Sequence, residues 1–276
     1  MATLDRAQIL LTNDDGIRSP GLWAAAEALS KLGFVTVAAP REQRSGSGRS
    51  MPQESDGIIR REEVTVGGKT WEVYAVGGSP AQAVQHGILE IMPRRPDLVA
   101  AGINYGENVG TSVTISGTVG AALEGAAFGV PSMAVSVQVE SSHYLSYSKE
   151  VDFDAAAHFT EFFARKLLSG AKLDDVDVLK IDVPMTATPE TPWRVTRLSR
   201  SNYFVPVKPE RDNLELPARL GFRQSVELEK LERDSDVYAL WAEGVVAVTP
   251  LSLDLTARVD LGELERRMRV GTQSQG

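Results

Sequence analysis

Four short segments carry side chains that could bind a cation or a phosphate group. The first, TNDDG at residues 12–16, places the carboxylates of Asp14 and Asp15 directly after an apolar run. On its own this segment is typical of a turn, because Asn and Asp hydrogen-bond to their own backbone and Gly accepts a positive φ. Two adjacent carboxylates also form half of a site for a hard divalent cation, provided that other segments supply further oxygen ligands.

The other three segments supply such oxygen atoms and backbone donors. They read APREQRSGSGRS (39–50), AGINYGENVG (101–110) and ISGTVGAA (115–122). Ser45 offers a hydroxyl and Asn104 an amide carbonyl, which suit Mg²⁺, Mn²⁺ or Ca²⁺ better than zinc. Taken singly, each segment could instead be a turn, a surface loop or a helix N-cap. Together with the aspartates they indicate a metal site beside an anion site.

A bound cation would also explain how two neighbouring carboxylates stay ionised, since like charges so close raise each other's pKa. The residues Ser116, Gly117 and Thr118 open a predicted helix, where free N–H groups and the positive end of the helix dipole favour an anion. This combination of a metal held by oxygen ligands and a phosphate-sized site suggests metal-assisted hydrolysis of a phosphoester.

Alternating strands and helices are expected to position these segments. Buried strands are predicted at residues 7–12, 34–40, 97–103, 131–138 and 176–184, and a hairpin at 64–76 around two glycines. Helices are predicted after Ser19-Pro20, after Ser79-Pro80, at 117–129 and at 152–170. This pattern predicts an α/β fold, a Rossmann-like and mostly parallel sheet with helices on both faces. In such sheets ligands bind at the carboxyl ends of the strands, where all four segments fall.

The pattern changes after about residue 190. The stretch that follows is β-rich with prolines, and we expect a hairpin at 236–256 and a short helix at 261–270. We therefore predict a metal- and phosphate-binding core at 1–190 and a C-terminal β-rich and helical extension at 191–276. This extension is too thin for a core of its own and should pack on the core or act as an oligomerisation arm.

Composition excludes several classes of protein. The 276 residues carry a net charge of −8, which gives no support to a broad surface for nucleic acids or membranes. The absence of cysteine excludes disulfides, thiolate nucleophiles and zinc-thiolate sites. The sequence lacks a leader-like apolar segment, and no apolar run reaches the ~18–20 residues of a spanning helix, so we expect a cytoplasmic protein. Dinucleotide-binding, P-loop and α/β-hydrolase motifs are also absent.

The four segments, in this order, resemble the survival protein SurE family of metal-dependent nucleotidases and acid phosphatases. The resemblance begins at ILLTNDDGIRSPGLWAAAEAL (9–29) and continues through VAAPREQRSGSGRS (37–50), VGGSPAQAV (76–84) and PDLVAAGINYGENVG (96–110). It extends through SGTVGAALEGAAFGVPSMAVS (116–136) to GVVAVTPLSLDLT (244–256). The stretch 205–235 matches the family least.

The resemblance implies a site and a reaction. It implies that one divalent cation per subunit is held by Asp14, Asp15, Ser45 and Asn104. Nucleoside 5′- and 3′-monophosphates would then be hydrolysed to nucleoside and phosphate by a metal-activated water. In this hypothesis Ser116, Gly117 and Thr118, with Ser45 and Gly46, bind the phosphate, and Asn13 and Asn108 are auxiliary donors. An aspartate or a metal hydroxide would act as the base. A homodimer or homotetramer with an exchanged C-terminal arm is also implied.

Two alternatives stay open at this point. An aspartyl-phosphate enzyme or phosphoacceptor would also place acidic residues after its first strand, with one of them as the nucleophile. A non-catalytic protein that binds nucleotides or metals is the second alternative. Trapping of a phosphoenzyme would favour the first, and metal-dependent release of phosphate would exclude the second.

Overall fold

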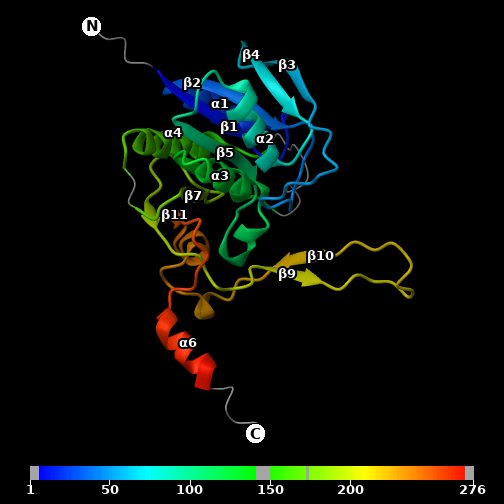
Figure 1. Ribbon diagram of the computed structural model, residues 1–276, viewed down its shortest axis with the longest axis vertical. Coiled ribbons are helices and arrows are strands. Elements are labelled where there is room, and N and C mark those ends of the chain that lie inside the picture. The colour runs from blue at the N-terminus through cyan, green and yellow to red at the C-terminus, as the bar shows by residue number, and fades with distance from the viewer. Residues whose placement is uncertain (1–5, 141–149, 172–173, 271–276) are drawn as a thin grey trace.

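A nine-stranded sheet forms the centre of the computed structural model, which describes residues 6–140, 150–171 and 174–270 (Figure 1). The strands, in their order across the sheet, are β3 (Ile59–Val66), β4 (Lys69–Val76), β2 (Gly33–Pro40), β1 (Ala7–Thr12), β5 (Leu98–Tyr105), β6 (Ser132–Val137), β7 (Val178–Val183), β11 (Val246–Leu251) and β8 (Trp193–Val195). A separate antiparallel ribbon joins β9 (Phe204–Val207) to β10 (Gly221–Gln224).

The sheet is mostly parallel, as predicted. Strands β4, β2, β1, β5, β6 and β7 run parallel to their neighbours in that series. The antiparallel pairs are β3 with β4, which is the predicted hairpin, and β7 with β11. Strand β3 is longer than the expected first arm and begins at Ile59, and its side chains alternate between more and less exposed positions, as expected of a strand at the edge of the sheet.

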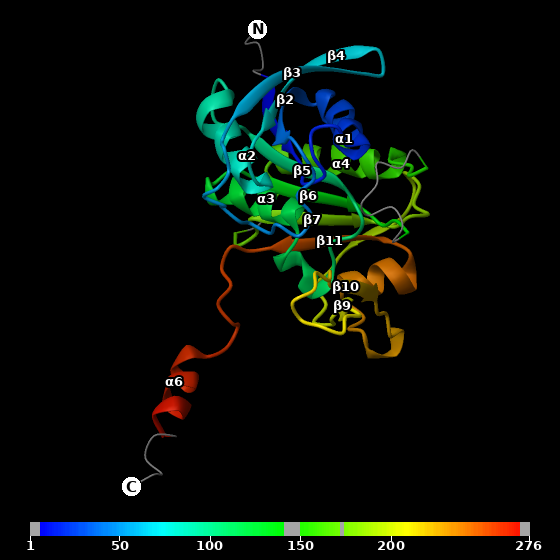
Figure 2. The same cartoon turned by 90° about the vertical axis from the view of Figure 1, so that its right-hand side faces the viewer.

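Helices cover both faces of the sheet (Figure 2). The helices are α1 (Pro20–Ser30), α2 (Pro80–His86), α3 (Gly117–Ala127), α4 (Asp154–Leu168), α5 (Asp236–Tyr238) and α6 (Leu261–Val270). Helices α1 and α4 pack on one face around a core of large aliphatic and aromatic side chains that includes Leu22, Phe159 and Ile181. Helices α2 and α3 pack on the other face, where smaller side chains such as Val84, Val99 and Ala122 predominate.

The direction of chain progression across the sheet reverses beside β1. From β1 the chain crosses through α1 to β2 on one side, and it returns to the other side of β1 with β5. A parallel sheet leaves a crevice at such a switch point, outside the carboxyl ends of the two strands. Asp14 follows β1 and Asn104 lies near the end of β5, so the fold brings these predicted ligands to the same crevice.

The predicted hairpin at 236–256 is wrong in its first half. Residues Asp236–Tyr238 form α5 and Ala239–Glu243 a π-helical turn, and only β11 is a strand. The Ser235 hydroxyl caps this helical segment by accepting from the Tyr238 N–H at 3.2 Å, and the left-handed Gly244 ends it. Val237 and Leu240 lie three residues apart and are buried on one side, which is helical spacing.

Two strands of the predicted extension, β8 and β11, belong to the main sheet. The β9–β10 ribbon and α6 extend away from the sheet, and α6 is the most distant labelled element (Figures 1 and 2). Its Leu261, Leu264 and Met268 are exposed. Among the described residues no helix combines the length and the apolar character needed to cross a membrane.

Candidate active site

The turn after β1 holds the two predicted carboxylates in a fixed position. Asn13 closes this turn with two hydrogen bonds, because its Oδ1 accepts from the Gly16 N–H at 3.1 Å and its Nδ2 donates to the Gly16 carbonyl at 3.0 Å. Gly16 has φ +96°, a conformation that favours glycine. Asn13 is fully buried and Asp14 and Asp15 are 5% and 2% exposed. The side chain of Asn13, predicted as an auxiliary donor, is therefore engaged with the turn itself.

Asp14 points to the beginning of α3. Its Oδ1 accepts a hydrogen bond from the Thr118 hydroxyl. Gly117 is so close that a Cβ on this residue would lie 2.7 Å from Asp14 Oδ2. Burial raises the pKa of Asp14 above its ordinary value, and the hydrogen bonds from Thr118 and from the backbone N–H groups of Gly117 and Thr118 oppose this shift only in part. The structure thus places the predicted phosphate-binding turn directly against a predicted metal ligand.

Asp15 points to the end of β5. Its Oδ2 accepts from the Tyr105 N–H at 3.2 Å, and its Oδ1 accepts from Gln43 Nε2 at 3.1 Å. Burial and the neighbouring charge of Asp14 raise the pKa of Asp15 to about 8, although both of these hydrogen bonds favour the ionised form. Two adjacent carboxylates in such an environment share a strong electrostatic cost when both are ionised.

These carboxylates fit a divalent cation. No lysine or arginine within the described residues forms an ion pair with Asp14. No group of three or more His, Cys, Asp or Glu side chains in the same ranges is arranged around a metal position. The predicted ligand set contains only two such side chains, and its other members are a serine hydroxyl and an amide. Oxygen donors of this kind suit Mg²⁺, Mn²⁺ or Ca²⁺.

The loop at 41–50 lies beside the two aspartates and contributes a hydroxyl that the sequence did not single out. The Arg44 N–H donates to the Asp14 carbonyl at 2.6 Å. Ser47 Oγ is buried and has no hydrogen-bond partner among the described residues, and it lies 2.7 Å from where a Gly117 Cβ would be. A buried hydroxyl without a partner is costly, and a bound ligand would satisfy it. Ser47 and Gln43 therefore line the candidate site.

Ser45 and Gly46 are exposed on the same loop. Ser45 lines a cavity of about 510 Å³ together with Gln43, Arg44 and Ser47. The loop is fastened beyond this point, where Arg49 Nε pairs with Glu124 Oε2 of α3 at 2.6 Å. Ser45 thus lies on an anchored loop whose preceding residues, Gln43 and Arg44, contact the two aspartates.

Asn104, near the end of β5, and Asn108, in the loop that follows, have different partners. Asn104 is half-buried, and its Nδ2 donates to the Gly106 carbonyl at 2.7 Å and to the Tyr105 carbonyl at 3.2 Å. Both bonds are made by Nδ2 and leave Oδ1 for an acceptor role, as a metal ligand requires. Asn108 is held by Ser136, whose Oγ accepts from its Nδ2 at 2.8 Å.

Ser116 caps α3, since its Oγ accepts from the Val119 N–H at 3.1 Å. Ser116 would therefore bind phosphate only through the hydrogen-bonding capacity that the cap leaves free, together with the neighbouring N–H groups. The N-terminus of α3 points at Asp14, so the same N–H groups face the centre of the crevice.

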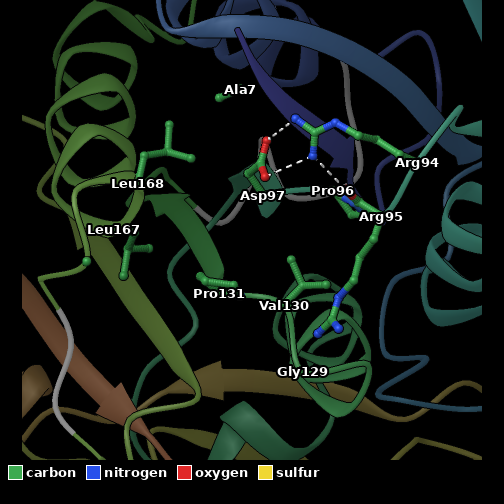
Figure 3. Close-up of a pocket in the computed structure, with 11 residues that line it drawn as sticks. Ala7, Arg94, Arg95, Pro96, Asp97, Gly129, Val130, Pro131, Leu167 and Leu168 are labelled. Carbon is green, nitrogen blue, oxygen red and sulfur yellow. Dashed lines mark hydrogen bonds and ion pairs between the residues drawn. The ribbon is translucent and has the colours of Figure 1, made fainter. Parts of the chain in front are cut away.

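A second hollow, of about 820 Å³, lies at the amino-terminal ends of the strands, near the beginnings of β1, β5 and β6 (Figure 3). Its guanidinium groups are already engaged. Arg94 forms two hydrogen bonds with the Asp97 carboxylate at 2.8 and 3.0 Å, and Arg95 donates to the Phe128 carbonyl at 2.6 Å. The carboxyl edge, where Asp14 and Asp15 lie, is the edge at which open α/β sheets bind ligands.

Comparisons with known proteins identify the family of this chain. A family model described as survival protein SurE matches residues 9–205. The chain belongs to the survival protein SurE family. It is 40% identical to the 5′-nucleotidase SurE of Methanosarcina mazei, over 96% of this chain and 99% of that protein. It is 41% identical to the 5′-nucleotidase SurE of Thermococcus gammatolerans, over 94% of each.

A solved structure of the SurE protein from Aquifex aeolicus is also similar. It aligns with a TM-score of 0.74 at 29% identity, and the match covers 95% of this chain and 99% of that one. The predicted α/β fold is thereby confirmed. The predicted resemblance of the chain to the SurE family is confirmed as well.

Proposed function

We propose that this chain hydrolyses nucleoside 5′-monophosphates to nucleoside and phosphate, as expected of a SurE protein with relatives named 5′-nucleotidase. The observation that carries the proposal is the pair of buried carboxylates at the switch point of the sheet, where Asp14 faces the N-terminus of α3 and Asp15 faces the end of β5. Nucleoside 3′-monophosphates are proposed as a second class of substrate.

A divalent cation, Mg²⁺ or Mn²⁺ in our proposal, would be held by Asp14, Asp15, Ser45 and Asn104. When bound it would supply a water molecule of lowered pKa and would polarise the phosphoryl group. The exposed Ser45 and the half-buried Asn104 complete a set of oxygen ligands that the two carboxylates begin.

The remaining residues would bind and orient the phosphate. The N–H groups at the start of α3, from Gly117 and Thr118, carry the positive end of the helix dipole toward the crevice. Both the hydroxyl and the N–H of Thr118 hydrogen-bond to Asp14, so in this proposal the phosphate would share these donors with that carboxylate. Ser47 has an unsatisfied hydroxyl beside Gly117 and is proposed as a further donor. Asn108 is proposed as a donor to the negative charge that develops during hydrolysis.

The proposal is tested by release of phosphate from adenosine 5′-monophosphate and from p-nitrophenyl phosphate. Protein stripped with a chelator is assayed alone and after Mg²⁺ or Mn²⁺ is added. Asp14→Asn and Asp15→Asn are compared with Asp212→Asn, which changes an exposed aspartate distant in sequence from the site. We expect the site variants to lose at least about 100-fold in kcat/KM, with the control unchanged.

Near-normal turnover in both site variants, together with undiminished metal occupancy, would contradict the proposal. A covalent phosphoenzyme trapped on Asp14 or Asp15 would replace it with an aspartyl-phosphate mechanism.

The C-terminal extension, residues 191–276, is proposed to act as an oligomerisation arm in a homodimer or homotetramer. The protruding β9–β10 ribbon and the exposed apolar side of α6 support this role. Sedimentation of the full chain and of a chain lacking α6 would test it. A cytoplasmic location, proposed from the sequence, is testable by cell fractionation.

A further inference from the structure

A fully buried cluster of three charged side chains lies beside the candidate site. Lys180 and Asp182 are two residues apart on β7, so their side chains share one face of the sheet, and Asp236 comes from α5. All three are 0% exposed. Lys180 Nζ forms ion pairs with Asp182 Oδ2 and, at 3.1 Å, with Asp236 Oδ2.

Backbone N–H groups satisfy the rest of these carboxylates. Asp182 Oδ1 accepts from the Asn108 N–H at 2.8 Å, and Asp236 Oδ2 accepts from the Gly110 N–H at 3.0 Å. Asp236 Oδ1 accepts from the N–H groups of Ser199 and Val237, each at 2.9 Å. Although burial disfavours a charged amine, the two carboxylates raise the pKa of Lys180 above its ordinary value. A buried ionic cluster is tolerated when its hydrogen bonds are satisfied to this degree.

The N–H groups that this cluster holds belong to the loop after β5, which carries Asn108 and directly follows the strand end that carries Asn104. The Asn108 side chain is held on the same face by Ser136, whose position on β6 is directly beside Asp182 in the sheet register. The loop is therefore bound at its backbone and at its side chain, from β6, β7 and α5 together.

A second tether joins the same loop to the C-terminal part of the chain. Glu107, 2% exposed, accepts at Oε1 from the Tyr203 hydroxyl and from Gln224 Nε2 at 2.8 Å. The Tyr203 hydroxyl in turn accepts from Trp241 Nε1 at 3.0 Å. Residues 199–241 thus fix the loop at Glu107 and at Gly110, on either side of Asn108.

We propose that Lys180, Asp182 and Asp236 are positioning residues that couple the C-terminal segment to the active-site loop and set the location of Asn108. The proposal rests on the function proposed above, in which Asn108 contacts the reacting phosphate. It assigns a role in turnover to Asp236, which is far from the carboxylate pair in sequence and does not contact substrate.

The test uses Asp236→Asn in the full chain. An asparagine cannot accept hydrogen bonds at both of its terminal side-chain atoms, so it must lose either the Gly110 and Lys180 contacts or the Ser199 and Val237 contacts. The matched control is Thr249→Val, which lies beside Lys180 in the β7–β11 register and loses the buried 2.8 Å hydroxyl contact with Thr196. This control perturbs the same region without touching the loop.

Three measurements separate positioning from stability. In Asp236→Asn we expect kcat to fall about 10- to 100-fold, with KM within about threefold of the wild-type value, because a misplaced donor is lost mainly in the transition state. Hydrogen–deuterium exchange should rise in the peptide that contains Asn108 and Gly110. Thr249→Val should keep kcat within about twofold of the wild-type value and leave exchange in that peptide unchanged. This holds even if its melting temperature falls as much as that of Asp236→Asn.

An Asp236→Asn protein with wild-type kcat and wild-type exchange in this loop would overturn the proposal, and so would equal losses of kcat in Asp236→Asn and Thr249→Val. Exchange is measured without substrate, so it tests the coupling even if wild-type protein releases no phosphate, which would instead refute the proposed function.

If Asp236→Asn fails to fold, Ser136→Ala decides the matter, since it removes only the side-chain contact with Asn108. A several-fold fall in kcat with unchanged melting temperature supports the positioning of Asn108 from this face. Unchanged kcat and exchange in Ser136→Ala would overturn it.

Discussion

Metal binding to the carboxylate pair should release protons at neutral pH. The pKa of Asp15 is raised to about 8 by burial and by the charge of Asp14. A carboxylate must be ionised to coordinate a cation, so the proton has to leave as the metal enters. The experiment therefore titrates metal-free protein with a divalent cation at a series of pH values.

The magnitude follows from this pKa. At pH 7 Asp15 is about 90% protonated, so binding should release about 0.9 proton from this residue. The dissociation constant should fall about ninefold between pH 6 and pH 7, and only about twofold between pH 8 and pH 9. The pKa of Asp14 is raised as well, which adds to the proton release.

Isothermal titration of chelator-stripped protein with Mn²⁺ measures both quantities. The number of protons released comes from titrations in buffers of different ionisation enthalpy, and the dissociation constants come from a series between pH 6 and pH 9. Asp15→Asn should bind Mn²⁺ more weakly, and its binding should release about one proton fewer than that of the wild type. Asp212→Asn, exposed and distant in sequence, should behave as wild type.

A dissociation constant that changes less than about twofold between pH 6 and pH 7 would refute this reasoning. The same holds for binding at pH 7 without proton release. Either result would mean that Asp15 is already ionised in the metal-free protein.

Three further predictions concern the same site. Metal-free protein should be less stable at pH 8 than at pH 5, because the raised folded-state pKa of Asp15 makes its ionisation costly to the fold as pH rises from about 4 to about 8. The difference, about 3–4 kcal/mol, should shrink in Asp15→Asn when denaturant unfolding is measured with chelator present. Gly117→Ala should destabilise the fold by about 1–3 kcal/mol and reduce kcat/KM at least about tenfold, since its Cβ would lie 2.7 Å from both Asp14 Oδ2 and Ser47 Oγ. Gly221→Ala, whose Cβ would lie no closer than 3.8 Å to Val207, is the control, and equal effects in the two variants would contradict the steric argument. Ser47→Ala should lower kcat/KM about 3- to 30-fold with little change in melting temperature, whereas Ser50→Ala on the same loop should be neutral; equal rates in the two would exclude Ser47 from the site.

Local signals in the sequence were sufficient for most of the sheet and its helices. Apolar runs bounded by turn residues mark β1, β2, β5, β6 and β7. Ser79 followed by Pro80 marks the start of α2, and the structure adds a capping box in which Ser79 and Gln82 exchange hydrogen bonds. The short helical segment at 236–243 was missed, because its apolar residues also fit a strand and its cap is a single serine.

The candidate site was predictable to the level of segments and not of contacts. The sequence indicates Asp14, Ser45 and Asn104 as candidate ligands, because the carboxyl ends of parallel strands lie together along one side of the sheet. It does not indicate that Thr118 directs its hydroxyl to Asp14, since the same residue at a helix start could equally face a ligand. Nothing in the sequence separates Ser47 from Ser45, whereas in the structure the Ser47 hydroxyl is buried and Ser45 is exposed.

The buried cluster was out of reach for a different reason. Lys180 and Asp182 alternate with apolar residues in β7, and this spacing signals a shared face. Their third partner, Asp236, follows β7 by more than fifty residues and comes directly after the stretch 205–235, which matches the family least. A long-range ion pair of this kind becomes visible only once the chain is folded.

The contact between Asp236 and the Gly110 N–H spans 126 residues. During synthesis on the ribosome the carboxylate turn, α1 and the loop after β5 emerge well before this partner does. The nascent chain can therefore build β1, β2 and β5 early, while the loop that carries Asn108 waits for the last quarter of the polypeptide. Turnover by this enzyme should accordingly begin only after the C-terminal segment has been translated, so unfinished chains would hold the carboxylate pair without a fully ordered site.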